Sequence, residues 1–387
     1  MSRSSVGNRQ PTLPREANAE QRSAPPEAGG INRRTIATAG IATLIFSLAT
    51  PAGAQELPPT PDDLERELPS PRKAPAVGAK LSELPPPEPA GVSEGLFPGF
   101  VAQNVQTSGA TIHVLSRGSG PPLLLLHGHP ETHVTWHKVA PALTDSYTVI
   151  VPDLRGYGDS SKPDYSPGSQ EYSFRPMAQD MVEVMARFGH KQFMVAGHDR
   201  GGRVVHRMML DHSEVVTKGA VLDIAPTLTM YDDTSKEFAT KYIWWFLQIQ
   251  PAPMPEHLIS LDPGYYLRDH LAVQGKTPGA VTPEAMAEYI RCYCCKGTIR
   301  AVCEDYRAAA GIDLDQDRAD DKAGRKIKAP LLALWGAKGT VGTLWDVLAT
   351  WQPKTQAALE GQALPCGHLI PEEQPEMVIS QFRRFFA

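Results

Sequence analysis

Hydrophobic residues follow two different periods along the chain from about residue 97 onward. Alternating or continuous apolar runs predict strands at "ATIHVLSRG", "PLLLLHGHP", "YTVIVPDLRGYGDS", "QFMVAGHD", "GAVLDIAP", "APLLALWGAKG" and "QALPCGHLI". A helix that ends at Gly189 is also predicted. Its apolar residues recur three or four positions apart and are Met177, Met181, Val184, Met185 and Phe188. Helical patterns also occur in "RVVHRMMLDH" and "PEMVISQFRRFF". Strands that alternate with helices predict an α/β fold with a mostly parallel sheet flanked by helices.

The pattern changes between Thr227 and about Arg325. This stretch is rich in aromatic residues, has helical periodicity and contains no clear buried strand. We therefore expect a helical cap over residues 227–325. It would be inserted between two parts of one α/β core, residues 96–226 and 326–387.

The first 95 residues differ from the rest of the chain. This part contains the segment "INRRTIATAGIATLIFSLATPAGAQ". Paired arginines come first in it, a short apolar run follows, and small residues stand near its end. This is typical of a twin-arginine-like export signal over residues 1–54, cleaved after Ala54, and predicts a periplasmic protein. A membrane anchor is the alternative, but the run is shorter than the roughly 18 to 20 residues that span a bilayer. The proline-rich residues 55–95 predict a semi-extended linker.

Composition narrows the classes of partner and site. The 387 residues carry a formal net charge of −5, and no basic run indicates nucleic-acid binding. After signal removal we expect no membrane association. Four of the five cysteines, Cys292, Cys294, Cys295 and Cys303, crowd into "RCYCCKGTIRAVC". Their spacing matches no pair of Cys-x-x-Cys units, which favours local thiols with at most one disulfide over a metal site.

Reactive residues follow several predicted strands, at the edge where α/β sheets bind ligands. They are His127–Pro130, Asp199, Asp223 and His368. "GHDRG" joins a strand to a helix through a glycine-rich turn, which is the pattern of a nucleophile elbow. The carboxylate of Asp199 can displace a leaving group from saturated carbon and form an alkyl ester. An aspartate in such a turn is often only a turn residue. Here Asp199 precedes a candidate acid and a candidate histidine along the chain, and this order favours a catalytic role.

From Phe97 to the C-terminus the chain resembles α/β-hydrolases of the haloacetate (fluoroacetate) dehalogenase family. The matching segments are "LLLLHGHPETHVTW", "DLRGYGDSSKP", "AGHDRGGRVVHRM", "AVLDIAPT", "FLQIQPAPMPE", "CEDYRAAAGIDL" and "CGH". The resemblance implies an α/β-hydrolase fold with an inserted helical cap. It also implies hydrolytic dehalogenation of small 2-haloacids, chemistry that requires neither cofactor nor metal. Dimers are common in that family, which favours a homodimer.

The catalytic roles follow from the chain order and from the resemblance. Asp199 would be the nucleophile, and His368 would activate the water that hydrolyses the ester. Asp223 would orient His368, because no aspartate follows the "ALWGAKG" strand where many relatives place this acid. The backbone N–H groups of His129 and Arg200 would form the oxyanion hole.

The same resemblance suggests substrate contacts. Arg200 and Arg203 lie one helical turn apart after the nucleophile, which suits a grip on a small carboxylate. Arg203 could instead form a salt bridge within its helix. The family's halide-binding histidine, tryptophan and tyrosine correspond to Trp244, Trp245 and Tyr306. Because Trp244 replaces the histidine, release of chloride or bromide is easier to expect than release of fluoride, and Trp244 could equally serve cap packing.

Two other functions stay open from the sequence. An epoxide hydrolase would use the same Asp–His–Asp set with cap tyrosines as acids, Tyr306 with Tyr242 or Tyr231. Arg200 argues against it, because such enzymes usually have tryptophan there. A binding or scaffold protein that has lost efficient catalysis is the third hypothesis. His129, where the family usually has phenylalanine, adds a titratable ring of unknown effect.

Overall fold

The computed structural model describes residues 93–387, in which eight strands form one sheet. The strands are β1 (Val101–Gln106), β2 (Thr111–Arg117), β3 (Pro122–Leu126), β4 (Thr148–Pro152), β5 (Phe193–His198), β6 (Val216–Leu222), β7 (Leu331–Gly336) and β8 (Leu359–Leu364). Their spatial order is β1-β2-β4-β3-β5-β6-β7-β8, and β2 alone runs antiparallel to its neighbours, β1 and β4. The mostly parallel sheet predicted from the sequence is confirmed.

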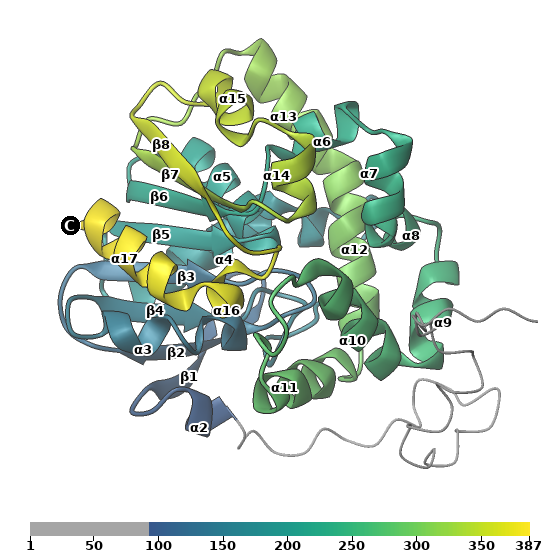
Figure 1. Ribbon diagram of the computed structural model, residues 1–387, viewed down its shortest axis with the longest axis horizontal. Helices are drawn as coiled ribbons and strands as arrows, with labels where there is room; N and C mark the ends of the chain where they lie inside the picture. Colours follow the sequence, from purple (N-terminus) through teal and green to yellow (C-terminus); the bar gives the residue numbers. More distant parts are fainter. Residues whose placement is uncertain (1–92) are drawn as a thin grey trace, which may run out of the picture. The chain divides into compact units, whose positions relative to one another are not determined.

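Helices cover both faces of this sheet. On one face, α4 (Phe174–Arg187) packs against α5 (Arg200–Asp211), which in turn packs against β5 and β6. On the other face, α3 (Ala140–Leu143) packs against α17 (Pro375–Phe386), which lies in front of the sheet in Figure 1. Central strands are therefore buried on both sides, which explains their continuous apolar sequences.

Helices alone fill the stretch between β6 and β7. They are α6 (Thr227–Asp232), α7 (Lys236–Lys241), α8 (Ile243–Gln248), α9 (Met254–Leu261), α10 (Pro263–Gln274), α11 (Pro283–Tyr293), α12 (Thr298–Ala310) and α13 (Ile312–Lys322). We call residues 227–322 the helical insertion. Figure 1 shows it beside the end of the sheet where β5 leads into α5, and α12 contacts α5 there through Asp305 and Arg200.

Short helices complete the described part of the chain. They are α2 (Ser93–Leu96), α14 (Thr340–Leu344), α15 (Val347–Trp351) and α16 (Ile370–Glu373), with 3-10 turns at His133–Trp136, Gln170–Tyr172 and Gln352–Lys354. No helix within residues 93–387 is long and apolar enough to cross a membrane. The expected export signal and nearly all of the expected linker lie outside the described residues.

The strands differ from the sequence predictions in two places. Strand β1 was not predicted, because five of its six residues are exposed at the sheet edge and carry no apolar alternation. Strand β8 ends at Leu364, so the predicted strand at residues 362–370 is mostly a loop and a short helix. All five cysteines, which lie in the described part, are free thiols, as the favoured interpretation of the cysteine cluster expected.

Two glycines make the junction between β5 and α5 tight. A Cβ atom on Gly201 would lie 2.5 Å from the carbonyl oxygen of His127. A Cβ atom on Gly197 would lie 2.4 Å from the carbonyl carbon of Gly201. Both contacts are with backbone that cannot move aside, so only glycine lets the strand, the helix and the loop after β3 approach this closely.

Replacing Gly201 therefore tests the junction. We expect Gly201→Ala to lower the free energy of unfolding by about 1–3 kcal/mol, the usual range for an overpacked site, in urea titrations followed by circular dichroism. Gly264→Ala in α10 is the matched control, because its Cβ would meet mainly the flexible Arg268 side chain, at 3.2 Å. Equal effects of the two substitutions would contradict the close approach.

Candidate active site

Asp199 occupies the turn between β5 and α5 in a backbone conformation that non-glycine residues rarely adopt. Its φ is 46° and its ψ is −113°. The turn is held on both sides, because the Asp199 N–H donates to the Leu222 carbonyl at 3.2 Å and its carbonyl accepts from the Arg203 N–H at 3.2 Å. Backbone strain of this kind is maintained where the surrounding structure fixes it, and it is concentrated at functional sites.

The two carboxylate oxygens of Asp199 have different neighbours. Oδ1 accepts the backbone N–H of His129 at 2.9 Å, and Oδ2 lies 3.8 Å from Nε2 of His368. Burial by itself would raise the pKa of Asp199, but the charges of His368 and Arg203 outweigh it and lower this pKa below its usual value. The N-terminus of α5 adds partial positive charge. Asp199 is therefore an ionised carboxylate with one oxygen held and the other facing His368.

The predicted pair of His368 and Asp223 forms in the structure. His368 Nδ1 lies 2.5 Å from Asp223 Oδ2, and Asp223 Oδ1 accepts the Gly336 N–H at 2.8 Å. Asp223 also has a positive φ, 50°. Nδ1 faces Asp223, and the other ring nitrogen, Nε2, lies on the side of Asp199 and is buried without a hydrogen-bond partner. This arrangement is suited to a general base.

A second histidine–carboxylate pair supports the first. His198 Nδ1 donates to Glu131 Oε2 at 2.9 Å, and His198 Nε2 donates to the backbone carbonyl of His368 at 2.8 Å. A ring with acceptors at both nitrogens is protonated. Burial opposes this charge, but Glu131 outweighs burial and raises the pKa of His198 to about 9. The pair thus holds the backbone of His368 and places a positive charge next to Asp199.

The two predicted substrate arginines have different partners. Arg200 donates through Nε to Asp305 Oδ2 at 2.9 Å, and its Nη2 also bonds to Asp305. Tyr157 donates to the same carboxylate at 2.6 Å. Only Nη1 of Arg200 is buried without a partner. Most of the charge of Arg200 is therefore compensated by α12, which the sequence did not indicate.

Arg203 is buried without a carboxylate in ion-pair contact among the described residues. Its Nη1 donates to Thr227 Oγ1 at 3.0 Å and, at 3.3 Å, to the Ala225 carbonyl. Its Nε is buried without a hydrogen-bond partner, and its guanidinium lies 4.6 Å from the Trp245 ring centroid. The alternative of a salt bridge within the helix is wrong for Arg203. The charge of Arg203 is therefore available to an anion. The same charge helps to lower the pKa of the nearby Asp199.

Two of the three predicted halide-contact residues, Trp245 and Tyr306, lie close to these arginines. The guanidinium of Arg200 lies 4.2 Å from the ring centroid of Tyr306, and the rings of Tyr306 and Trp245 are 6.4 Å apart. Trp245 Nε1 is buried without a partner. Trp244 packs instead against His270 of α10, with ring centroids 4.1 Å apart. The structure therefore brings Trp245 and Tyr306 to the arginines and gives Trp244 a neighbour that the sequence did not indicate.

Several residues of this site were missed in the sequence. Glu131 and Asp305 lie inside the segments "HGHPETHVTW" and "CEDYRAAAGIDL", but their partners are far away along the chain and cannot be read from spacing. His198 is the neighbour of the nucleophile. His270 lies in "YYLRDHLAVQ", which carries no motif.

Comparisons with known proteins agree with this fold. Residues 121–252 match the family model of the alpha/beta hydrolase fold. Over 293 residues the chain is 39% identical to a fluoroacetate dehalogenase from a Burkholderia species, covering 76% of this chain and 95% of that protein. The chain belongs to the α/β-hydrolase superfamily. The resemblance stated from the sequence motifs is confirmed at this level.

Other relatives of this α/β-hydrolase bear different functional names. A soluble epoxide hydrolase from Corynebacterium sp. (strain C12) is 35% identical over 283 residues, covering 72% of this chain and 95% of that protein. A crystal structure titled as a putative acyltransferase from Salmonella enterica is 52% identical, with a TM-score of 0.74, covering 75% of this chain and 96% of that chain. The comparisons therefore give the superfamily and leave the specific reaction to the chemistry of the site.

The His198–Glu131 pair predicts a pH dependence of stability. The pKa of His198 is raised from 6.5 to about 9, so its stabilising charge is fully present below about pH 6.5 and is lost as the pH rises through 9. We expect the free energy of unfolding to fall by about 3 kcal/mol over this range in urea titrations. Glu131→Gln should remove most of this fall.

A neighbouring carboxyl provides the control. Burial and the charge of Glu131 raise the pKa of Glu372 to about 8. The loss of unfolding free energy that Glu372 itself causes as the pH rises is therefore complete near pH 8. In Glu372→Gln the free energy of unfolding should therefore still fall between about pH 8 and 9. Parallel stability curves for the wild type and Glu131→Gln would show that His198 is not charged.

Proposed function

We propose that this α/β-hydrolase is a hydrolytic dehalogenase of small 2-haloacids, converting a haloacetate to glycolate and halide. The observation that carries the proposal is the buried Arg203, which within residues 93–387 has no carboxylate in ion-pair contact and lies beside the candidate nucleophile Asp199. A buried charge without a partner is costly, and the carboxylate of a 2-haloacid would compensate it. Similarity to a relative named fluoroacetate dehalogenase supports the same reaction.

In the first step, Asp199 attacks the saturated carbon that bears the halogen. Oδ2 is the attacking oxygen, because Oδ1 is held by the His129 N–H. The new Oδ2–carbon bond forms as the carbon–halogen bond breaks, and the bonding pair leaves with the halide. The substrate carboxylate binds Arg203, assisted by the free Nη1 of Arg200. The N–H of Trp245 and the O–H of Tyr306 are the hydrogen-bond donors expected for the halide.

In the second step, water hydrolyses the ester. His368 Nε2 removes a proton from water, whose oxygen attacks the carboxyl carbon of Asp199. Asp223 stabilises the imidazolium that forms. Negative charge then develops on Oδ1, where the His129 N–H already donates, and the N–H of Arg200 at the start of α5 is the expected second donor. The acyl carbon–Oδ2 bond breaks, the proton held by His368 passes to the departing oxygen of glycolate, the second water proton is released to solvent, and Asp199 is regenerated as a carboxylate.

Epoxide hydrolysis is the second candidate function, and one observation favours it. The hydroxyl groups of Tyr242 and Tyr231 are buried without hydrogen-bond partners. Burial raises the pKa of both, so both stay protonated and could donate to an epoxide oxygen. The relative named soluble epoxide hydrolase supports this reading. A neutral epoxide would, however, leave the charge of Arg203 uncompensated.

The location of the reaction rests on the segment before the described residues. We propose that the twin-arginine-like signal over residues 1–54 directs export to the periplasm. The observation behind this is the sequence "RRTIATAGIATLIFSLATPAGA".

Turnover is tested with fluoro-, chloro- and bromoacetate, with halide and glycolate quantified by ion chromatography. We expect halide release that falls by at least about 10⁴-fold in Asp199→Asn, the order of loss when a nucleophile is removed. His368→Gln should instead accumulate the ester, visible by mass spectrometry as one carboxymethyl group on the peptide that contains Asp199. Turnover of styrene oxide without any halide release would select the epoxide function.

Charge recognition is tested with a pair of substrates of similar shape. Arg203→Gln should lower kcat/KM for chloroacetate by about 10²-fold or more, because it removes a buried charge partner. Chloroacetamide has no charge, so its kcat/KM should change by less than about tenfold. An equal loss for both substrates would mean that Arg203 supports the fold and does not bind the carboxylate.

A further inference from the structure

Six aromatic side chains contact one another in a closed circuit beside Asp199 and His368. In order, the ring-centroid distances are Tyr306–His129 5.3 Å, His129–His270 5.0 Å, His270–Trp244 4.1 Å, Trp244–Tyr242 5.1 Å, Tyr242–Trp245 5.9 Å and Trp245–Tyr306 6.4 Å. Tyr242 also lies 6.3 Å from the ring of His368. Five of the six residues come from the helical insertion, and His129 comes from the loop after β3.

This circuit holds an unusual number of buried polar atoms without partners. They are Nδ1 of His129, both ring nitrogens of His270, the hydroxyl of Tyr242 and Nε1 of Trp245. Buried polar groups in proteins nearly always find a hydrogen-bond partner, and a group without one requires an explanation. Because the circuit adjoins the nucleophile and its base, the polar atoms of a bound substrate are suitable partners.

His270, like Trp244 and Tyr242, has no role in the dehalogenation steps described above. Its side chain is 3% exposed, and it packs between the rings of Trp244 and His129. Burial and the charge of His368 lower the pKa of His270 to about 3, against an opposing effect of Asp199. The ring is therefore neutral and always carries one N–H donor.

His129 is held differently from His270. Its Nε2 lies 3.3 Å from the side-chain amide of Gln248, which also bonds to the hydroxyl of Tyr266 at 2.9 Å. One nitrogen of His129 thus has a partner, whereas neither ring nitrogen of His270 has one within 3.5 Å in the described part of the chain; the side chain of Gln274, whose Oε1 is also buried without a partner, is the polar neighbour that affects the pKa of His270. A histidine that serves packing alone would be expected to satisfy at least one nitrogen, so His270 is the stronger candidate for a ligand contact.

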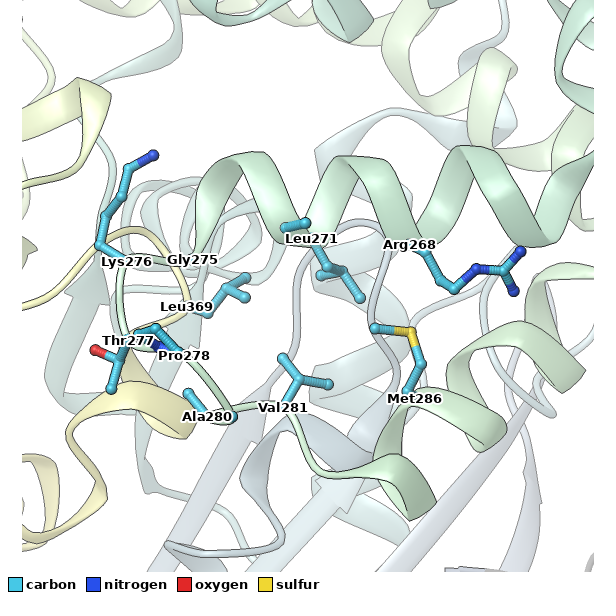
Figure 2. A pocket seen from close by; sticks show the side chains of 12 residues that line it. Arg268, Leu271, Gly275, Lys276, Thr277, Pro278, Ala280, Val281, Met286 and Leu369 are labelled. Atoms are coloured by element: carbon cyan, nitrogen blue, oxygen red, sulfur yellow. The ribbon is translucent and has the colours of Figure 1, made fainter. Parts of the chain in front are cut away.

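Helix α10, which carries His270, borders a cavity and contacts the loop of His368 at its end. Leu271, the next residue, lines a cavity of about 350 Å³ together with Arg268, Gly275, Met286 and Leu369 (Figure 2). The carbonyl of Gln274, at the end of α10, accepts the backbone N–H of His368 at 3.1 Å. The helix is therefore anchored directly to the loop of the catalytic base.

We propose that His270 is a leaving-group-binding residue of this site, whose neutral ring N–H donates to the halide as it departs. The proposal rests on the proposed dehalogenase function. The family's halide-binding histidine is replaced by Trp244 in this chain. His270 of α10 would supply a histidine donor from a different helix. The step needs no proton transfer: the carbon–halogen bonding pair leaves on the halide, and the N–H of His270 stabilises the developing charge.

His270→Phe tests the donor, because phenylalanine keeps a ring against Trp244 and removes the N–H. Poorer leaving groups need more hydrogen bonding, so we expect kcat/KM to fall by about 10²-fold for chloroacetate and by about tenfold or less for bromoacetate. His270→Gln, which retains an N–H donor, should recover part of the chloroacetate activity. Arg268→Gln is the control on the same helix, since Arg268 faces the cavity in Figure 2, and it should change both values by less than about twofold.

An equal loss for the two haloacetates, or no loss, would overturn the proposal. A second readout is independent of turnover: bromide binding, measured by quenching of tryptophan fluorescence, should weaken about tenfold in His270→Phe. If the wild type releases no halide, the dehalogenase function fails and the bromide measurement alone decides the role of His270. Unchanged bromide affinity would then reject it, and weakened affinity would support a halide contact.

Discussion

The turn at Asp199 is the constraint on which the rest of the site depends. Asp199 has a positive φ in this turn, and the glycines on either side let β5, α5 and the loop after β3 approach closely. That approach places the His129 N–H within 2.9 Å of one oxygen and leaves the other oxygen facing His368. A longer or looser turn would separate nucleophile, base and backbone donor, which act only at short range.

Charge compensation joins the helical insertion to the core and separates the roles of two arginines. Asp305 of α12 and the Tyr157 hydroxyl that bonds to it surround the guanidinium of Arg200, so this pair connects the insertion to the first turn of α5. Arg203, one turn further on, is buried with neutral partners. The positive charge available to a substrate therefore comes mainly from Arg203, although both arginines lie on the same helix.

Two histidine–carboxylate pairs meet at the candidate base, and their rings differ in the number of hydrogen-bond acceptors around them. His368 shares one nitrogen with Asp223 and keeps the other free, so it can accept a proton. His198 has an acceptor at each nitrogen, Glu131 and the His368 carbonyl, so it is a cation. The charged His198–Glu131 pair thus orders the backbone of His368 through the hydrogen bond from His198 Nε2 to the His368 carbonyl.

The sequence by itself determined the parallel sheet, the elbow, and the order of Asp199, Asp223 and His368. These follow from short-range patterns: apolar runs, turn glycines, and reactive residues at strand ends. It did not show strand β1, whose exposed residues carry no apolar pattern, nor the ends of β8. Only the tertiary structure decided that Asp305 pairs with Arg200, that Glu131 charges His198, and that His270 lies against Trp244. Each of these contacts joins segments far apart in the sequence, and such pairing depends on three-dimensional packing that no local spacing records.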